Sequence, residues 1–235
     1  MCPDPGDGGR NAGSSRRSGN VGCAGHRRRP ATDSAGRHDL LAHRAGWFFA
    51  CRAATWDTKF GDDLPAYRAA VAEAGIRPGG VVLDVGCGTG RALPPLRAAV
   101  GPDGAVIAVD MTPEMLAAAR PAASTAKASL VIADARVLPF ADRCADAIFA
   151  AGLVNHFPDT EAGLRELARV TRPDGLLVLF HPSGRAALAA RHGRALSPDE
   201  PLAEGPLRRF TAASGWRLTA YQDAPHRFFA VAERR

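Results

Sequence analysis

A glycine-rich loop with one aspartate before it and another after it has the residue types and spacing that could do chemistry. The loop reads GCGTG over Gly86–Gly90, directly after the apolar run VVLDV and before a segment of helical periodicity. Glycines let the backbone turn sharply and let a ligand approach the amides at a helix start. Asp84 precedes the loop by two residues, and Asp110 ends the next apolar run. A carboxylate at that second position can accept from both hydroxyls of a ribose, so the pattern predicts a nucleotide site.

The glycine spacing and the charge of Asp84 decide between two classes of nucleotide. A dinucleotide carries a pyrophosphate and is typically bound by G-x-G-x-x-G, whereas this loop is G-x-G-x-G. The Asp84 carboxylate would repel a pyrophosphate but would attract an ammonium or a sulfonium. The residues therefore favour S-adenosylmethionine as cofactor, and an NAD(P)-dependent oxidoreductase is the alternative.

Apolar runs that alternate with helical segments must position these residues. Near-continuous apolar runs separated by helices are typical of a parallel sheet covered on both faces. The last two runs are joined by a short link and predict an antiparallel edge hairpin. The runs predicted as strands are VVLDV, AVIAVD, SLVIAD, DAIFAAGL, LLVLF, WRLTAYQ and RFFAVAE. We therefore expect an α/β fold, a Rossmann-like doubly wound and mostly parallel sheet of seven strands with an antiparallel edge hairpin.

Composition divides the chain into three parts. Residues 1–40 are dominated by Gly, Arg, Ser and Pro, so we expect a disordered tail; the alternative is a start codon placed too far upstream. Residues 41–78 are expected to form a helical cover, and residues 79–235 the cofactor-binding domain. Within that domain, the polar connection 183–205 is long enough to act as a lid.

The formal net charge of +6 is concentrated near the N-terminus. Residues 1–56 carry nine Arg and four Asp, whereas residues 57–235 carry 21 basic and 20 acidic residues. A nucleic-acid binder would carry a basic patch on its folded domain, so this class is disfavoured. The five cysteines form no C-x-x-C pair, which argues against a zinc site or a disulfide framework and favours the cytoplasm. No run approaches the roughly 18 apolar residues of a membrane span.

Five motifs in succession resemble those of the class I S-adenosylmethionine-dependent methyltransferases. They are VLDVGCGTG, AVDMTPEML, IADARVLPFAD, DAIFAAGLVNHF and ELARVTRPDGLLVL. The resemblance is to the small-molecule type, in the subgroup that includes ubiquinone- and menaquinone-biosynthesis methyltransferases. It implies the class I methyltransferase fold, S-adenosylmethionine as cofactor, and methylation at O or C of an aromatic, quinone-like or polyketide-like small molecule. A methyltransferase-like protein that binds without turnover is a further alternative.

The resemblance also implies which residues contact the methionine part of the cofactor. Asp84 and the loop backbone would surround it, and the carbonyls of Ala150 and Ala151 would face its amine. Cys87 is interpreted as a small packing residue in the loop and not as a nucleophile. The full set implied to bind the cofactor is Asp84, Gly86, Cys87, Gly88, Gly90, Asp110, Met111, Asp134, Ala135, Ala150 and Ala151.

The nucleoside part is implied to lie against the next two motifs. Asp110 would bind the ribose hydroxyls, and Met111 would pack on the adenine face. Asp134 would accept from the adenine amino group, helped by the Ala135 amide. No metal is expected in this site.

Two histidines are candidates for the base that removes a proton from the acceptor, a role that adds roughly 10²–10⁴-fold to a rate. His156 follows the fourth predicted strand by a few residues and would lie over the methyl group; alternatively it is a helix-entry residue that caps backbone. His181 leaves the fifth predicted strand at the edge where ligands bind in open α/β sheets, and it could equally be a turn residue before Pro182.

Two further groups have both a functional and a structural interpretation. Arginines after residue 180 either meet an anionic substrate or form a solvated face; they are Arg185, Arg191, Arg194, Arg208 and Arg209. Aromatic residues before the core either cover the pocket or pack a helix on the domain; they are Trp47, Phe48, Phe49, Trp56 and Phe60.

Overall fold

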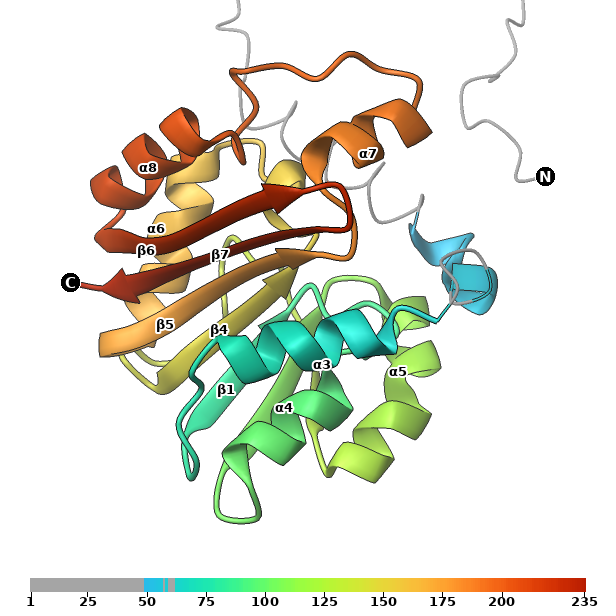
Figure 1. The fold of residues 1–235 in the computed structure, drawn as a ribbon. Coiled ribbons are helices and arrows are strands. Elements are labelled where there is room, and N and C mark those ends of the chain that lie inside the picture. The colour runs from blue at the N-terminus through green and yellow to red at the C-terminus, as the bar shows by residue number, and fades with distance from the viewer. Residues whose placement is uncertain (1–48, 57, 59–61) are drawn as a thin grey trace, which may run out of the picture.

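A seven-stranded sheet lies at the centre of the protein (Figure 1). The computed structural model describes residues 49–56, 58 and 62–235. The strands are β1 (Val81–Val85), β2 (Ala105–Asp110), β3 (Ser129–Ile132), β4 (Ala145–Ala151), β5 (Thr171–His181), β6 (Trp216–Ala224) and β7 (Arg227–Arg234). Their order is β3-β2-β1-β4-β5-β7-β6, with β1 to β5 parallel and β7 antiparallel to both of its neighbours. The expected α/β sheet with an antiparallel edge hairpin is confirmed.

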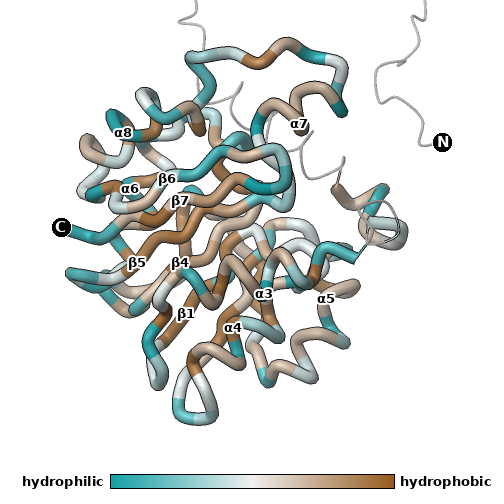
Figure 2. The backbone as a smooth tube through the Cα atoms, viewed as in Figure 1, coloured by the Kyte–Doolittle hydropathy of each residue, from teal (hydrophilic) through white to brown (hydrophobic). Residues whose placement is uncertain are grey.

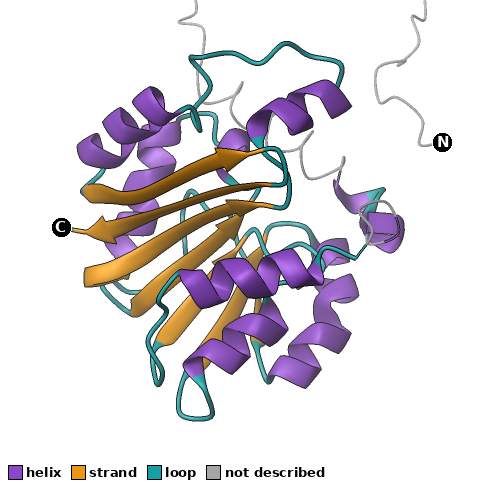
Figure 3. Cartoon of the chain, viewed as in Figure 1, coloured by secondary structure: helices purple, strands orange, loops and turns teal. Residues whose placement is uncertain are grey.

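Helices cover both faces of this sheet (Figure 3). They are η1 (Ala53–Thr55), α3 (Leu64–Glu73), α4 (Leu93–Val100), α5 (Pro113–Ala126), η2 (Val154–His156), α6 (Thr160–Val170), α7 (Arg185–Arg191) and α8 (Glu204–Ala213). Buried residues of α3, α4 and α5 pack in one core cluster, and those of α6 and α8 pack in another. None of the helices in the described ranges has both the length and the apolar character needed to cross a bilayer.

The strand sequences produce these two cores because successive side chains point to opposite faces. On β1, Val82 packs with α3 and α4, whereas Leu83 and Val85 pack with α6. On β4, Phe149 faces the first core and Ile148 the second. Figure 2 shows the resulting hydrophobic interior along the central strands. Because side chains alternate along β1, the Asp84 carboxylate lies on the same face of the sheet as Val82, which α3 and α4 cover.

Two segments differ from the simplest interpretation of the sequence. β5 begins at Thr171, well before the apolar run, and its pairing with β4 jumps from Thr171 to Leu176 while β4 advances from Ala145 to Ala147. The extra residues form a bulge in which Asp174 has φ 61°. The connection after residue 182 contains α7, a single short helix, before its long loop (Figure 3).

The N-terminal tail expected over residues 1–40 lies outside the described residues, as do the first residues of the expected helical cover. The described part of that cover includes η1 and α3. Tyr67 of α3 packs its ring on Phe180, with centroids 4.9 Å apart, and Arg227 of β7 pairs with Glu73. These contacts hold α3 on the face of the sheet that it shares with α4.

Candidate active site

The glycine loop after β1 is held open by its backbone conformation. Gly86, Gly88 and Gly90 have φ values of 73°, 53° and 82°, a region that side chains rarely adopt. The amides of Gly86 and Cys87 donate to the Val109 carbonyl at 2.8 and 3.0 Å, which fixes the loop against β2. A Cβ on Gly90 would lie 2.9 Å from Cδ1 of Leu93, so a larger residue there would require that side chain to shift in addition to adopting the positive φ. The loop is therefore a rigid cradle at the carboxyl end of β1.

Asp84 brings a buried carboxylate to this cradle. The residue is 1% exposed, and neither carboxylate oxygen has a hydrogen-bond partner among the described residues. Burial, with a smaller contribution from the nearby Asp110, raises the pKa of Asp84 to about 8. An unpaired buried polar group costs free energy, and a cation placed beside it would supply the missing partner. The geometry fits an ammonium group.

Asp110 lies at the end of β2, beside the loop. Its Oδ2 accepts from the Gly88 amide and its Oδ1 from the Thr112 amide, both at 2.9 Å. Burial raises the pKa of Asp110, and the backbone amides oppose that shift. Each carboxylate oxygen keeps a second acceptor position, so Asp110 can hold the loop and still accept from a hydroxyl.

Cys87 belongs to the loop but is not an activated thiol. Its side chain is buried, and it forms no disulfide. Burial, with the negative charges of Asp84 and Asp110, raises the pKa of the Cys87 thiol far above its usual value. A nucleophilic cysteine needs a lowered pKa, so the side chain packs and the backbone of Cys87 faces the cradle.

The residues predicted for the adenine lie along the next two strand ends. Met111 is 39% exposed directly after Asp110, so its side chain is available to a planar ring. Asp134 follows β3, and both of its oxygens accept from the Arg136 guanidinium, at 2.9 and 3.0 Å from Nε. Burial alone would raise the pKa of Asp134, but the hydrogen bonds and charge of Arg136 hold it below its usual value. Ala135, between them, is partly buried.

Ala150 and Ala151 lie at the carboxyl end of β4, next to the glycine loop. Phe149 is the β4 residue in register with Asp84, so these two alanines extend beyond the pairing with β1. Ala150 is buried and Ala151 partly buried. Gly152 then turns the chain with φ 69°, and its amide donates to the Phe180 carbonyl at 2.9 Å. The structure thus places the ends of β1, β2 and β4 side by side in the sheet.

His156 ends η2, which follows β4. Its ring packs edge-on against Phe49, with centroids 5.2 Å apart, and Phe49 in turn contacts Trp56 at 5.5 Å. Burial lowers the pKa of His156. Phe49 thus contacts a candidate catalytic residue and Trp56 packs on Phe49, whereas Trp47, Phe48 and Phe60 lie outside the described residues.

His181 ends β5 and lies at the same edge of the sheet. Its Nδ1 lies 3.1 Å from the Ser183 amide nitrogen and 3.0 Å from the Ser183 carbonyl oxygen, so it accepts from the amide in one tautomer and donates to the carbonyl in the other. Only the second tautomer leaves Nε2 able to accept a proton. Burial lowers the pKa of His181, and the Ser183 hydrogen bond partly offsets this. The backbone of Ser183 therefore engages Nδ1, which leaves Nε2 as the nitrogen for a ligand.

A small pocket lies between the ends of β4 and β5 and the segment that follows α7. We call it the α7 pocket, and its lining includes Gly152, His181, Ser183, Arg185, Leu202 and Phe228. A second hollow, lined by Ala150, shares Gly152, Leu202 and Phe228 with it. The two hollows are therefore neighbours near the end of β4.

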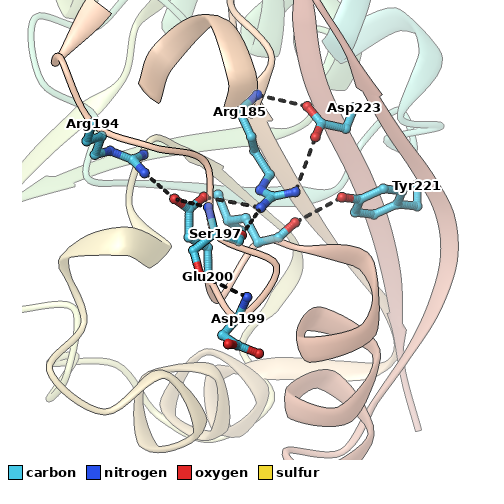
Figure 4. Close-up of polar contacts among 8 residues, drawn as sticks. Arg185, Arg194, Ser197, Asp199, Glu200, Tyr221 and Asp223 are labelled. Atoms are coloured by element: carbon cyan, nitrogen blue, oxygen red, sulfur yellow. Dashed lines mark hydrogen bonds and ion pairs between the residues drawn. The ribbon is translucent and has the colours of Figure 1, made fainter. Parts of the chain in front are cut away.

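Ion pairs hold the segment after α7 over this pocket (Figure 4). Arg185 is only 11% exposed in its side chain; its guanidinium pairs with Asp223 at 3.3 Å and with Glu200 at 3.2 Å. Glu200 also pairs with Arg194, and the Tyr221 hydroxyl donates to the Leu202 carbonyl at 3.0 Å. Arg185 is therefore a buried arginine whose charge is paired. Arg208 is also paired, with Glu204, but that pair is exposed to solvent.

Two of these contacts were missed by sequence reasoning. Asp223 and Glu200 were not singled out, because nothing local links them to Arg185, 38 and 15 residues away. The ion pair between Asp63 and Arg91 was missed for the same reason, although it ties the start of α3 to the residue after the glycine loop. The sequence offered one indication of the contacts of Arg185: acidic residues such as Glu200 lie in the same segment as several arginines.

Comparisons with known proteins agree with this geometry. Residues 83–179 match the Methyltransferase domain family. A demethylmenaquinone methyltransferase of Staphylococcus aureus (strain JH9) is 37% identical over 112 residues, 47% of this chain and 46% of the relative. The chain spans about half the length of the curated relatives it matches.

Solved structures support the fold. A SAM dependent methyltransferase from Aquifex aeolicus has a TM-score of 0.61 and 24% identity, covering 72% of this chain and 89% of that one. A [4+2]-cyclase has a TM-score of 0.57 and 19% identity, covering 72% and 80%. The same fold therefore supports more than one reaction. Residues 83–179 therefore resemble the methyltransferase domain family, and the sheet has the fold of the class I S-adenosylmethionine-dependent methyltransferases.

Proposed function

We propose that the chain is an enzyme that transfers a methyl group from S-adenosylmethionine to O or C of a small aromatic, quinone-like or polyketide-like molecule. The observation that carries the proposal is Asp84, a buried carboxylate with two unpartnered oxygens beside an open glycine loop. The family match and the similarity to a quinone-pathway relative favour the same reaction class.

The residues at the strand ends fit the parts of this cofactor. The methionyl ammonium would pair with Asp84, and the carbonyls of Ala150 and Ala151 would face it from β4. The ribose hydroxyls would donate to Asp110, whose oxygens each keep an acceptor position beyond the loop amides. The adenine would lie on Met111, with its amino group toward Asp134.

Positioning is the main task of the protein in methyl transfer. The cofactor supplies a methyl group on a positively charged sulfur, which a nucleophile displaces in line. The chain would hold the acceptor at the ends of β4 and β5, where η2 and α7 close over it. His156 and His181 are the proposed proton acceptors there, because burial lowers both pKa values and keeps the imidazoles neutral near pH 7.

The alternatives differ in how many of these features they account for. A dinucleotide would place a pyrophosphate next to the buried Asp84, where the two negative charges repel. Two further alternatives would use the same glycine loop and Asp84. One is a protein that binds the cofactor without methyl transfer, and the other is a protein of this fold that uses the cofactor for a different reaction. A nucleic-acid substrate is disfavoured, because residues 57–235 are nearly neutral.

The proposed function is tested with a labelled methyl donor. The full chain is incubated with methyl-labelled S-adenosylmethionine and a panel of phenols, quinols and amines, and the products are analysed by mass spectrometry. We expect label in a phenol or quinol. The same reactions are run with His156→Ala and with His181→Ala. The histidine whose replacement abolishes turnover but leaves cofactor binding intact is identified as the base. Cofactor binding without any labelled product would favour the non-catalytic alternative.

A further inference from the structure

The α7 pocket contains a hydrogen-bond donor that the protein itself leaves unused. Arg185 lines the pocket, and its Nε is buried and has no hydrogen-bond partner among the described residues. The rest of the guanidinium is engaged: Nη1 donates to Asp223, and Nη2 donates to the Ser197 carbonyl at 2.8 Å and to Glu200. These contacts hold the group in one orientation, so the unused N–H has a fixed direction.

The charge of the pocket restricts what this donor can bind. Arg185 and Arg194 carry two positive charges, and Glu200 and Asp223 carry two negative charges within the same network (Figure 4). An anion would therefore gain little attraction, and it would lie close to two carboxylates. A neutral oxygen can accept from Nε–H without that repulsion, and it satisfies a buried donor whose isolation costs free energy.

The pocket has a volume of about 10 Å³, which is room for one oxygen-sized group, so the ring or hydrocarbon that carries such an oxygen would lie at its mouth. Its other walls are apolar. Leu188, Leu202 and Phe228 are apolar, and Phe228 is 1% exposed. His181 completes the polar side, with Nδ1 engaged by the Ser183 backbone. The pocket also shares Gly152 with the hollow beneath Ala150, so its occupant would lie beside the proposed cofactor.

We propose that the α7 pocket binds the methyl acceptor and that Arg185 positions it, through Nε–H, by a neutral carbonyl or hydroxyl oxygen on an apolar ring system. This inference rests on the proposed function for the identity of the occupant as methyl acceptor. Arg185 is a specificity residue in this account: its two carboxylate partners remove its general attraction for anions and leave one directed hydrogen bond.

The test uses three ring compounds of similar size: 1-tetralone, which carries a neutral carbonyl; tetralin, which has no oxygen; and 1-naphthoate, which is anionic. Binding of each to the full chain is measured by ligand-observed NMR, with and without S-adenosylhomocysteine. We expect 1-tetralone to bind roughly tenfold more tightly than tetralin, the contribution of one hydrogen bond to a charged donor. We expect 1-naphthoate to bind no more tightly than 1-tetralone.

The variant Arg185→Lys separates this role from a structural one. Lysine keeps the charge and can pair with Glu200 or Asp223, but it lacks the fixed Nε–H. We expect the preference for 1-tetralone over tetralin to disappear, while the melting temperature and the affinity for S-adenosylhomocysteine stay close to wild type. Arg208→Lys, in the exposed pair with Glu204, is the matched control and should keep the preference.

Three outcomes would overturn the inference: equal binding of 1-tetralone and tetralin by the wild type, tighter binding of 1-naphthoate, or a preference that survives in Arg185→Lys. Failure of the proposed function has a different signature: the full chain would bind no S-adenosylmethionine, or it would bind the cofactor and give no labelled product with the acceptor panel. The preference among the three ring compounds is measured without cofactor as well, so the two results are independent.

Discussion

The two halves of the candidate site treat their buried charges in opposite ways. At the ends of β1 and β2, the buried carboxylate of Asp84 has no hydrogen-bond partner among the described residues, and it lies in β1 directly before the glycine loop. At the ends of β5 to β7, Arg185 is nearly as inaccessible but is neutralised by Glu200 and Asp223, from two other segments. We propose that the first half binds a cation. In the second half, two carboxylates compensate the charge of Arg185, and its Nε is a donor without a partner among the described residues.

This difference explains which part of the site the sequence could reveal. Asp84, the glycines and Asp110 lie within thirty residues, and each follows directly from a strand end, so their spacing encodes their geometry. The ion pairs of Arg185 form only when α7, the segment after it and β6 come together, because Glu200 and Asp223 are distant in sequence. No local spacing therefore predicts them. A change in Asp84 should therefore disturb ligand binding, whereas a change in Asp223 should disturb the fold of one segment.

The largest expected effect is on cofactor affinity in Asp84→Asn. The variant removes the charge that would pair with the ammonium, and truncating one member of a buried charge pair costs about 2–5 kcal/mol in binding. Isothermal titration with S-adenosylmethionine should show a loss of roughly thirtyfold or more. A cooperative unfolding transition of Asp84→Asn serves as the control, because it shows that the variant is folded. Retention of full affinity would mean that Asp84 does not hold the ammonium.

The same carboxylate should leave a mark on the pH dependence of stability. The pKa of Asp84 is raised to about 8 in the folded chain, so the folded state binds this proton more tightly than the unfolded state does. The contribution of protonated Asp84 to the free energy of unfolding is greatest below about pH 4, the pKa of an ordinary aspartate. It is lost as the pH rises through about 8. Relative to Asp84→Asn, the wild type should therefore lose on the order of a few kcal/mol of unfolding free energy between these values. Urea denaturation at both pH values measures this, and a constant difference would contradict it.

Asp110→Ala should weaken cofactor binding less than the change at Asp84. It removes an acceptor for the ribose hydroxyls, worth about 1.5–3 kcal/mol. It also leaves the amides of Gly88 and Thr112 without their partner, so the loop itself should become less ordered. Titration gives the affinity, and hydrogen exchange at Gly88 reports the loop. Faster exchange without a loss of affinity would assign Asp110 to the loop alone.

The smallest effect belongs to the neutral half. Asp223→Asn removes one charge from Arg185, which keeps Glu200 and the Ser197 carbonyl, so we expect a loss of about 1 kcal/mol of unfolding free energy. Cofactor affinity should not change. Glu204→Gln, in the exposed pair with Arg208, is the control and should cost under about 0.5 kcal/mol. A cofactor affinity that falls with Asp223→Asn would show that the two halves are coupled.

Much of the fold followed from short-range patterns. The apolar runs predicted the strands because a sheet covered on both faces buries nearly every side chain. The bulge at Asp174 was harder, since its positive φ depends on how β5 pairs with β4. The helix Arg185–Arg191 fell in a region expected to be a loop, because its seven residues are too few to show a clear helical period.

The most direct test of the account is a calorimetric titration of the full chain with S-adenosylmethionine at pH 7, repeated in two buffers of different ionisation enthalpy. If the buried Asp84 accepts the ammonium, its proton must leave on binding, so the two heats should differ by the amount that corresponds to release of most of one proton. Asp84→Asn should release none. Tight binding without proton release, or binding of NADH in place of S-adenosylmethionine, would contradict the account.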